Sequence, residues 1–185
     1  MSKFPPVLET ERLILRPLIM EDAADVFEYA GDAETVEYML FDRHTSIYDT
    51  VNFLSGRLAA YENGTSYDYA FVLKETGKMI GTGGVFNAKN LPHSAEIGYI
   101  LNKKYWGKGY AAEGMRAVID FLFDTLRVHR VEAYHRKENP RSGRVMQKLG
   151  MTYEGTSVDA MFIKGEYRTI VRYAVINDKK DKNEP

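Results

Sequence analysis

Residues Trp106–Gly114 read WGKGYAAEG, a glycine-rich turn that continues directly into a predicted helix. Gly107 and Gly109 allow the backbone to take positive φ angles and to approach a ligand closely. The N–H groups at the start of a helix attract anions, as does the positive end of the helix dipole. The stretch is therefore typical of a phosphate-binding turn, although a helix that merely begins with glycines has the same pattern. The apolar residues that follow share one helical face: Met115, Val118, Ile119, Leu122 and Phe123.

Two other kinds of glycine-rich phosphate site fit this stretch less well. A Walker loop requires Gly-Lys-Ser/Thr, and a tyrosine follows Gly109 here, which excludes a P-loop. Gly107, Gly109 and Ala112 satisfy the dinucleotide pattern GxGxxA, and Glu132 lies near the expected acidic position. In that motif the first strand directly precedes the first glycine. Here the polar stretch NKKYW separates the apolar run 95–101 from Gly107, so the pattern disfavours a Rossmann fold.

The composition indicates one domain without a general affinity for polyanions. The chain has 185 residues, of which 44% are hydrophobic, enough for a sizeable core, and we expect a single domain over residues 1–176. It carries 25 Lys and Arg against 26 Asp and Glu, so its net charge does not favour nucleic acid or membrane. Residues 177–185 are charged and predict a frayed tail.

The residue types that are missing also narrow the function. The chain has no cysteine, which excludes a disulfide framework, a zinc–thiolate site and a cysteine-bound acyl intermediate. The first residues lack the apolar core of a signal peptide, and no apolar run is long enough to span a bilayer. We therefore expect a soluble cytoplasmic protein.

Periodicity and turn residues predict a mixed α/β order. Because a helical crossover joins the runs 94–101 and 130–135, these two strands are expected to be parallel. The last two strands are expected to form a hairpin around Lys164-Gly165-Glu166. The other predicted strands are 12–17, 67–73 and 79–86, and the predicted helices are 20–30, 33–40, 46–63 and 141–149, besides the helix that follows the glycine turn.

Four motifs in this order resemble the Gcn5-related N-acetyltransferases, and specifically the branch of the ribosomal-protein N-terminal acetyltransferases. They are LETERLILRPL (8–18), Lys104-x-x-Gly107-x-Gly109, ENPRSGRVMQKLGM (138–151) and GTSVDAMFIKGEYRTIVRYAVI (155–176), and they cover nearly the whole chain. Lys104 departs from the family's glutamine or arginine and keeps only the charge. The resemblance implies a central, mostly antiparallel sheet with one parallel, splayed pair of strands, flanked by helices.

The resemblance also implies that acetyl-coenzyme A is the co-substrate and that no metal takes part. The coenzyme's pyrophosphate would bind the amides of the glycine turn, and its pantetheine arm would pair with the main chain near residues 99–101. Asn139 and Ser142 would form the opposite wall, although Asn139-Pro140 also fits a helix cap. The residues implied for the coenzyme are Tyr99, Ile100, Leu101, Lys104, Gly107, Lys108, Gly109, Tyr110, Ala111, Ala112, Asn139 and Ser142.

Acetyl transfer to an amine requires a neutral amine and a departing thiolate. Glu96 begins the strand that carries the cofactor contacts and is our candidate for the general base, with a structural or substrate-anchoring role as the alternatives. Many family members protonate the thiolate with a tyrosine on the helix after the asparagine. This chain has Val145, Met146 and Gln147 there, which leaves Ser142 as the nearest match for the acid.

We therefore expect an acetyl-coenzyme A-dependent N-acetyltransferase that acts on a primary amine, with a protein or peptide N-terminal α-amine as the first candidate. The alternatives are a small-molecule amine acceptor, such as a polyamine, an amino acid or an antibiotic, and a non-catalytic acyl-coenzyme A sensor on the same fold. We expect no direct binding of nucleic acid or membrane, and a monomer or a homodimer.

Overall fold

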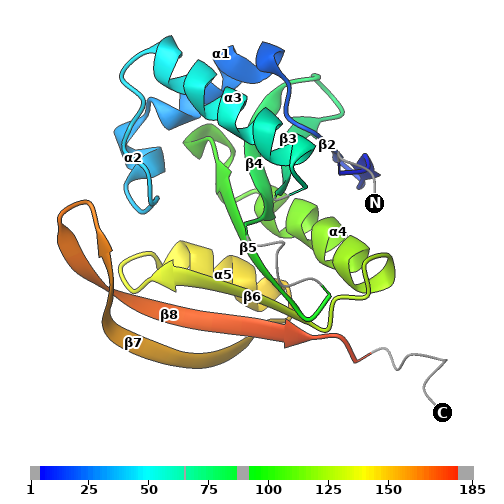
Figure 1. Cartoon of the computed structure of the whole chain (residues 1–185), viewed down its shortest axis with the longest axis vertical. Coiled ribbons are helices and arrows are strands. Elements are labelled where there is room, and N and C mark those ends of the chain that lie inside the picture. Colours follow the sequence, from blue (N-terminus) through cyan, green and yellow to red (C-terminus); the bar gives the residue numbers. More distant parts are fainter. Residues whose placement is uncertain (1–4, 65, 87–91, 179–185) are drawn as a thin grey trace.

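The computed structural model describes residues 5–64, 66–86 and 92–178, which form one mixed sheet flanked by helices (Figure 1). Its eight described strands run in the order β1-β2-β3-β4-β5-β6-β8-β7. The strands are β1 (Leu8–Glu9), β2 (Leu13–Arg16), β3 (Tyr67–Leu73), β4 (Met79–Val85), β5 (Ser94–Leu101), β6 (Arg130–Arg136), β7 (Thr152–Ile163) and β8 (Glu166–Ile176). The helices are η1 (Met20–Asp22), α1 (Ala23–Ala30), α2 (Ala33–Val36), α3 (Ile47–Glu62), η3 (Lys103–Tyr105), α4 (Tyr110–Asp124) and α5 (Pro140–Lys148).

The parallel pair that the sequence predicts is β5 and β6. Every other neighbouring pair of described strands is antiparallel. The two parallel strands pair only from Ser94↔Arg130 to Glu96↔Glu132, although both continue for several residues. The sheet therefore separates at its middle, as the family resemblance implies, and the mixed α/β fold with one parallel pair is confirmed.

Two groups of buried side chains cover the two faces of the sheet. The apolar stripe of α4 is fully buried in one group, to which Ile97 and Leu101 of β5 belong and which Met146 of α5 also joins. The other group joins Val26 of α1 and Leu54 of α3 to the opposite face of β3. This division follows from the period-two alternation of strands, and it decides which residues of β5 and β6 face which helices.

Helix α2 is shorter than the predicted range 33–40, because tertiary donors bind the carbonyls at its end. Lys164 Nζ donates to the carbonyl oxygen of Val36 (2.9 Å), and Arg136 Nη1 donates to that of Glu37 (3.0 Å). Together with the turn bond from Met39 N to the carbonyl oxygen of Val36 (3.0 Å), these donors satisfy carbonyls that have no helical i+4 partner here. The chain leaves the helix at this point, and residues 38–41 are free to form the wall of a cavity.

The ordered contacts reach the first residue of the predicted tail. Asn177 N donates to the carbonyl oxygen of His129 (2.8 Å), and Asn177 Nδ2 donates to that of Val128 (3.2 Å). The rest of the predicted tail, from residue 179 onward, lies outside the described residues. Within the described ranges, no helix is both long and apolar enough to cross a membrane.

Replacing Gly114 of α4 with alanine should destabilise the protein, although alanine is the better helix former. A Cβ at this position would lie 2.6 Å from Cε2 of Phe71, whose side chain is fully buried. The overlap forces a shift in the core and should cost about 1–3 kcal/mol. Gly56 of α3 is the matched control, because a Cβ there would meet no atom within 4 Å. Gly56→Ala should stabilise by about 0.5–1 kcal/mol. Urea unfolding measures the change in the free energy of unfolding for each variant. A change of the same sign in both variants would contradict the packing argument.

Candidate active site

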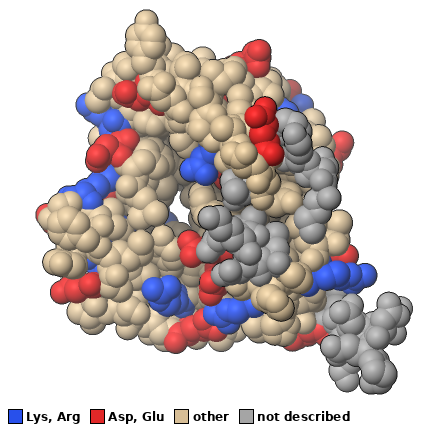
Figure 2. All heavy atoms as spheres, viewed as in Figure 1, with Lys and Arg blue, Asp and Glu red and all other residues tan. Residues whose placement is uncertain are grey.

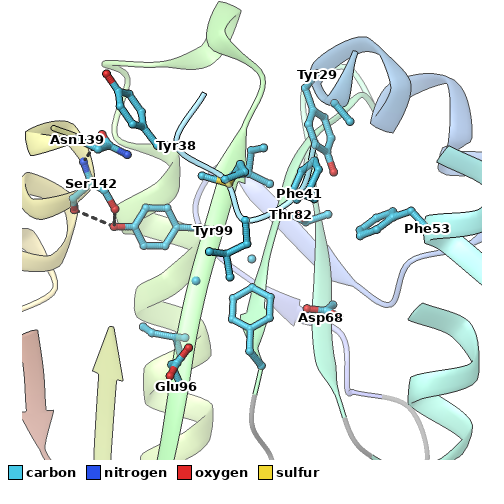
Figure 3. Close-up of a pocket in the computed structure, with 18 of the residues that line it drawn as sticks. Tyr29, Tyr38, Phe41, Phe53, Asp68, Thr82, Glu96, Tyr99, Asn139 and Ser142 are labelled. Carbon is cyan, nitrogen blue, oxygen red and sulfur yellow. Dashed lines mark hydrogen bonds between the residues drawn. The ribbon is translucent and has the colours of Figure 1, made fainter. Parts of the chain in front are cut away.

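A cavity of about 300 Å³ lies where β5 and β6 separate. Figure 2 shows an opening near the centre of this face of the molecule. Its walls come from elements that are far apart in the sequence: the segment after α2, helices α1, α3 and α5, and strands β3 to β6. Among its lining residues are Glu96, Tyr99, Ile100, Asn139 and Ser142, which the sequence analysis assigned to catalysis or to coenzyme binding (Figure 3).

Glu96 and Tyr99 reach the cavity from opposite faces of the sheet. Side chains alternate along a strand, so residues three apart point to different faces. Tyr99 packs against the buried group that includes α4, as do Ile97 and Leu101, whereas Ile100 packs against the group of α1 and α3. Glu96 shares the face of Ile100. Because both Glu96 and Tyr99 line one cavity, that cavity crosses the sheet at the gap between β5 and β6.

The surroundings of the Glu96 carboxyl group change its pKa. Burial raises the pKa of Glu96 above its ordinary value, and the like charge of Glu132, its register partner on β6, raises it further, whereas Arg172 lowers it. A carboxylate whose pKa is raised is a stronger base than an ordinary glutamate. The raised pKa of Glu96 is therefore set by burial and by residues of the neighbouring strands.

Tyr99 and Ser142 are joined directly across the gap (Figure 3). The phenol of Tyr99 donates a hydrogen bond to the carbonyl oxygen of Ser142 (2.8 Å) and lies 2.9 Å from Ser142 Oγ. Asn139 caps α5, since its side chain accepts a hydrogen bond from Ser142 N (3.3 Å). The alternative interpretation of Asn139 as a helix cap therefore holds in the structure, and the cap positions Ser142.

The cavity wall opposite α5 is aromatic, which the sequence analysis did not predict in detail. Phe41, His44 and Phe53 form a cluster with ring centroids 5.7–6.4 Å apart. Burial lowers the pKa of His44 below its ordinary value, which keeps its ring neutral at pH 7. These residues come from a loop and from the middle of α3, so no periodic pattern marks them as neighbours.

A second carboxylate, that of Asp68 on β3, also lines this wall and was missed by the sequence analysis. It is buried at 5% exposure, and it accepts hydrogen bonds from Ser66 Oγ (2.5 Å) and Arg57 Nη1 (3.1 Å). Its sequence context, the alternating strand YDYAFVL, gave only a weak signal: a single charge inside an apolar run.

The glycine turn has the conformation that the sequence predicts. Gly107 and Gly109 have φ angles of 77° and 86°, and α4 begins at the next residue, so the amides of residues 110–112 lie in its first turn. Arg12, in the turn between β1 and β2, supports the glycine turn: its Nη1 donates to the carbonyl oxygen of Lys108 (3.1 Å), and its guanidinium lies 4.4 Å from the ring centroid of Tyr110. Among the described residues that line the cavity, none belongs to this turn.

Two further residues assigned to the coenzyme have protein partners in the structure. Lys104 Nζ donates to Glu28 Oε1 (2.8 Å), and Lys78 Nζ donates to Glu28 Oε2 (2.7 Å). These two lysines lower the pKa of Glu28 to about 2. The carbonyl oxygen of Leu101 accepts a hydrogen bond from Trp106 Nε1 (2.8 Å), so a pantetheine arm would have to share that acceptor. In the described part of the chain, no group of three or more His, Asp or Glu side chains is arranged to hold a metal ion.

The comparisons with known proteins agree with this geometry. A family model described as an acetyltransferase (GNAT) domain matches residues 12–152. The chain belongs to the GNAT family. It is 31% identical over 169 residues to an uncharacterized N-acetyltransferase p20 of Bacillus licheniformis, covering 91% of this chain and 95% of that protein. A GNAT-family acetyltransferase structure from Bacillus anthracis superimposes with a TM-score of 0.85 at 28% identity, covering 94% of this chain and all of that one. This GNAT protein is therefore an acyltransferase.

Other relatives act on different amines. A spermidine N(1)-acetyltransferase of Escherichia coli is 26% identical, covering 87% of this chain and 84% of that protein. A [ribosomal protein uS5]-alanine N-acetyltransferase of the same organism is 28% identical, covering 62% of this chain and 60% of that protein. A ribosomal L7/L12 alpha-N-protein acetyltransferase solved in complex with coenzyme A has a TM-score of 0.82 at 20% identity, covering 94% of this chain and 99% of that one, which shows the shared fold. The acceptor therefore has to be inferred from the site itself.

Proposed function

We propose that this GNAT protein transfers an acetyl group from acetyl-coenzyme A to an N-terminal α-amine of a peptide or protein, with Glu96 as the general base. The observation that carries the proposal is the cavity that crosses the sheet, with Glu96 on one face and the Tyr99–Ser142 pair on the other. The amine approaches and loses its proton on the Glu96 side. The thioester reaches the gap from the side of α4, whose first turn binds the pyrophosphate.

The charges of the cavity favour an acceptor with a single amine over a polyamine. The described lining contains two acidic side chains, Asp68 and Glu96, and two basic ones, Arg57 and Arg136. Asp68 is already paired with Arg57, so only Glu96 is left to attract a cation. A polyamine that carries several positive charges would bury them without enough partners, which is costly. An α-amine with an apolar neighbour suits the aromatic wall better.

The chemistry of proton removal favours the same acceptor. An α-amine has a pKa near 8 and a lysine amine one near 10.4, so their neutral fractions at pH 7 are about one in ten and one in 2,500. A single carboxylate such as Glu96 has to deprotonate a much smaller excess of ammonium for the α-amine than for the lysine amine, so it suits the α-amine better.

An acceptor panel tests the proposal. The release of free thiol from acetyl-coenzyme A is followed with peptides that have a free α-amine, with the same peptides blocked at the α-amine but carrying a free lysine, and with spermidine. We expect kcat/KM at pH 7 to be at least about tenfold higher for the free α-amine peptides, because more of that amine is neutral. Mass spectrometry locates the acetyl group. A preference for spermidine or lysine would contradict the acceptor assignment, and binding without turnover across the panel would indicate a sensor.

A further inference from the structure

The hydroxyls of Tyr99 and Ser142 have a proton arrangement that the structure largely determines. A backbone carbonyl only accepts hydrogen bonds, so the phenol proton of Tyr99 points to the carbonyl oxygen of Ser142 at 2.8 Å. Each hydroxyl has one proton, and therefore Ser142 Oγ is the donor in the 2.9 Å contact with Tyr99 Oη. In this state the serine proton is directed at the phenol and is not available to a ligand.

A second state requires no movement of heavy atoms. The phenol oxygen lies at nearly equal distances from two acceptors, Ser142 O and Ser142 Oγ. Rotation about the phenol C–O bond moves the proton from the first to the second. Ser142 Oγ then accepts from Tyr99, and its own proton is released toward the cavity that both residues line. The two hydroxyls therefore behave as one unit with an internal and an outward-donating state.

We propose that Tyr99 is a positioning residue for thiolate departure, which acts by switching Ser142 to the state that donates to the sulfur. The proposal rests on the proposed acetyl transfer. The Tyr99–Ser142 pair lies on the side of the sheet that faces α4 and α5, opposite Glu96. When the amine attacks the thioester from the Glu96 side, the sulfur leaves toward the Tyr99–Ser142 pair. Tyr99 thus contributes a phenol from strand β5 to the stabilisation of the thiolate. The helix after Asn139 has no tyrosine for this purpose, because it carries Val145, Met146 and Gln147 there.

In this step the phenol of Tyr99 loses no proton overall. The amine nitrogen bonds to the thioester carbon, the C–S bond breaks, and the sulfur keeps the electron pair. Ser142 donates a hydrogen bond to this thiolate while Tyr99 donates to Ser142. An ammonium acceptor loses two protons on the way to the amide: Glu96 takes the first before the attack and returns it to solvent, and the second, lost as the amide forms, balances the proton that the thiolate finally binds. Burial raises the pKa of Tyr99 well above its ordinary value, so the phenol stays protonated throughout.

Kinetics of Tyr99→Phe and Ser142→Ala, alone and combined, test this unit. A thiol with a pKa near 8.5 leaves with little help, so we expect each variant to lower kcat by about 10- to 100-fold, at or below the lower end of the range for acid catalysis. KM for acetyl-coenzyme A should change less than about threefold, because the lost interaction acts in the transition state. The double variant should be no slower than the slower single variant, since both remove the same unit. Tyr153→Phe is the matched control: its phenol bonds only to Thr156 among the described residues, and its kcat should equal that of the wild type.

The outcomes are distinct. Wild-type turnover is measured first, and its absence would contradict the proposed function rather than the role of Tyr99. If the wild type is active, an unchanged kcat for Tyr99→Phe, or single effects that multiply in the double variant, would overturn the proposal. So would a higher KM with kcat retained, which indicates a role in binding. Circular dichroism and thermal unfolding check the fold, and Ser142→Ala, which removes only a partly exposed hydroxyl, keeps the test available if Tyr99→Phe unfolds.

Discussion

Glu96→Gln should lower turnover by about 10²–10⁴-fold at neutral pH while the affinity for acetyl-coenzyme A stays nearly unchanged. Glutamine keeps the size and the hydrogen bonding of the side chain but does not take up a proton. The wild-type rate should fall on the acidic side of the pKa of Glu96, which burial and Glu132 raise above its ordinary value. The variant should lose this limb and recover as the pH approaches the pKa of the amine, which then arrives already neutral. A pH–rate profile with calorimetry of acetyl-coenzyme A binding measures both.

Glu132→Gln is the matched control for this experiment. Glu132 is the register partner of Glu96 and shares its face, and its like charge raises the pKa of Glu96; its carboxylate also pairs with Arg130 Nε (3.3 Å), on the same strand. Removing that charge should leave the plateau rate close to that of the wild type and move the acidic limb to lower pH. If Glu96→Gln is slow at every pH and remains folded, Glu96 is not the base. If it raises KM for the amine and keeps kcat, Glu96 anchors the substrate.

Gly109→Val should weaken the binding of acetyl-coenzyme A by about 10- to 100-fold, because a β-branched residue at a positive φ costs about 1–3 kcal/mol of backbone strain. The φ angle of Gly109 is 86°, and this residue precedes the first turn of α4. A side chain there either distorts the turn or destabilises it, and it also approaches Arg12 Nη2, which would lie 3.5 Å from a Cβ. Calorimetry with acetyl-coenzyme A measures the loss.

Gly77→Val separates strain from binding. Gly77 has a φ of 69° in the turn between β3 and β4, and a Cβ there would meet no atom within 4 Å. The two substitutions should therefore lower the free energy of unfolding by similar amounts, but only Gly109→Val should lower the affinity for the coenzyme. Equal affinities in the two variants would contradict the phosphate-binding role of the turn.

Local patterns in the sequence were sufficient for most of the fold. The stripe from Met115 to Phe123 predicted the buried face of α4, and the glycines of the turn predicted the positive φ angles. The crossover between β5 and β6 predicted their parallel pairing. These features depend on residues close in the chain, where backbone sterics and the period of side chains act directly. The predicted helix 33–40 was too long because its end is set by Arg136 and Lys164, more than ninety residues away.

In the candidate site, too, local patterns predicted some features, and others depend on the tertiary structure. The sequence alone determined that this chain has a glycine turn before a helix, an acidic residue on the strand before it and an asparagine–serine helix after it, and those motifs identified the family. Only the tertiary structure placed Asp68 and the ring of Phe41 in one cavity with Glu96, and only it brought the phenol of Tyr99 to 2.9 Å from Ser142 Oγ. The reason is that the residues within each of these groups lie 27 to 55 positions apart in the chain, on a sheet that separates between β5 and β6. Periodicity predicts which face of a strand a residue occupies, whereas tertiary packing determines which side chains that face contacts.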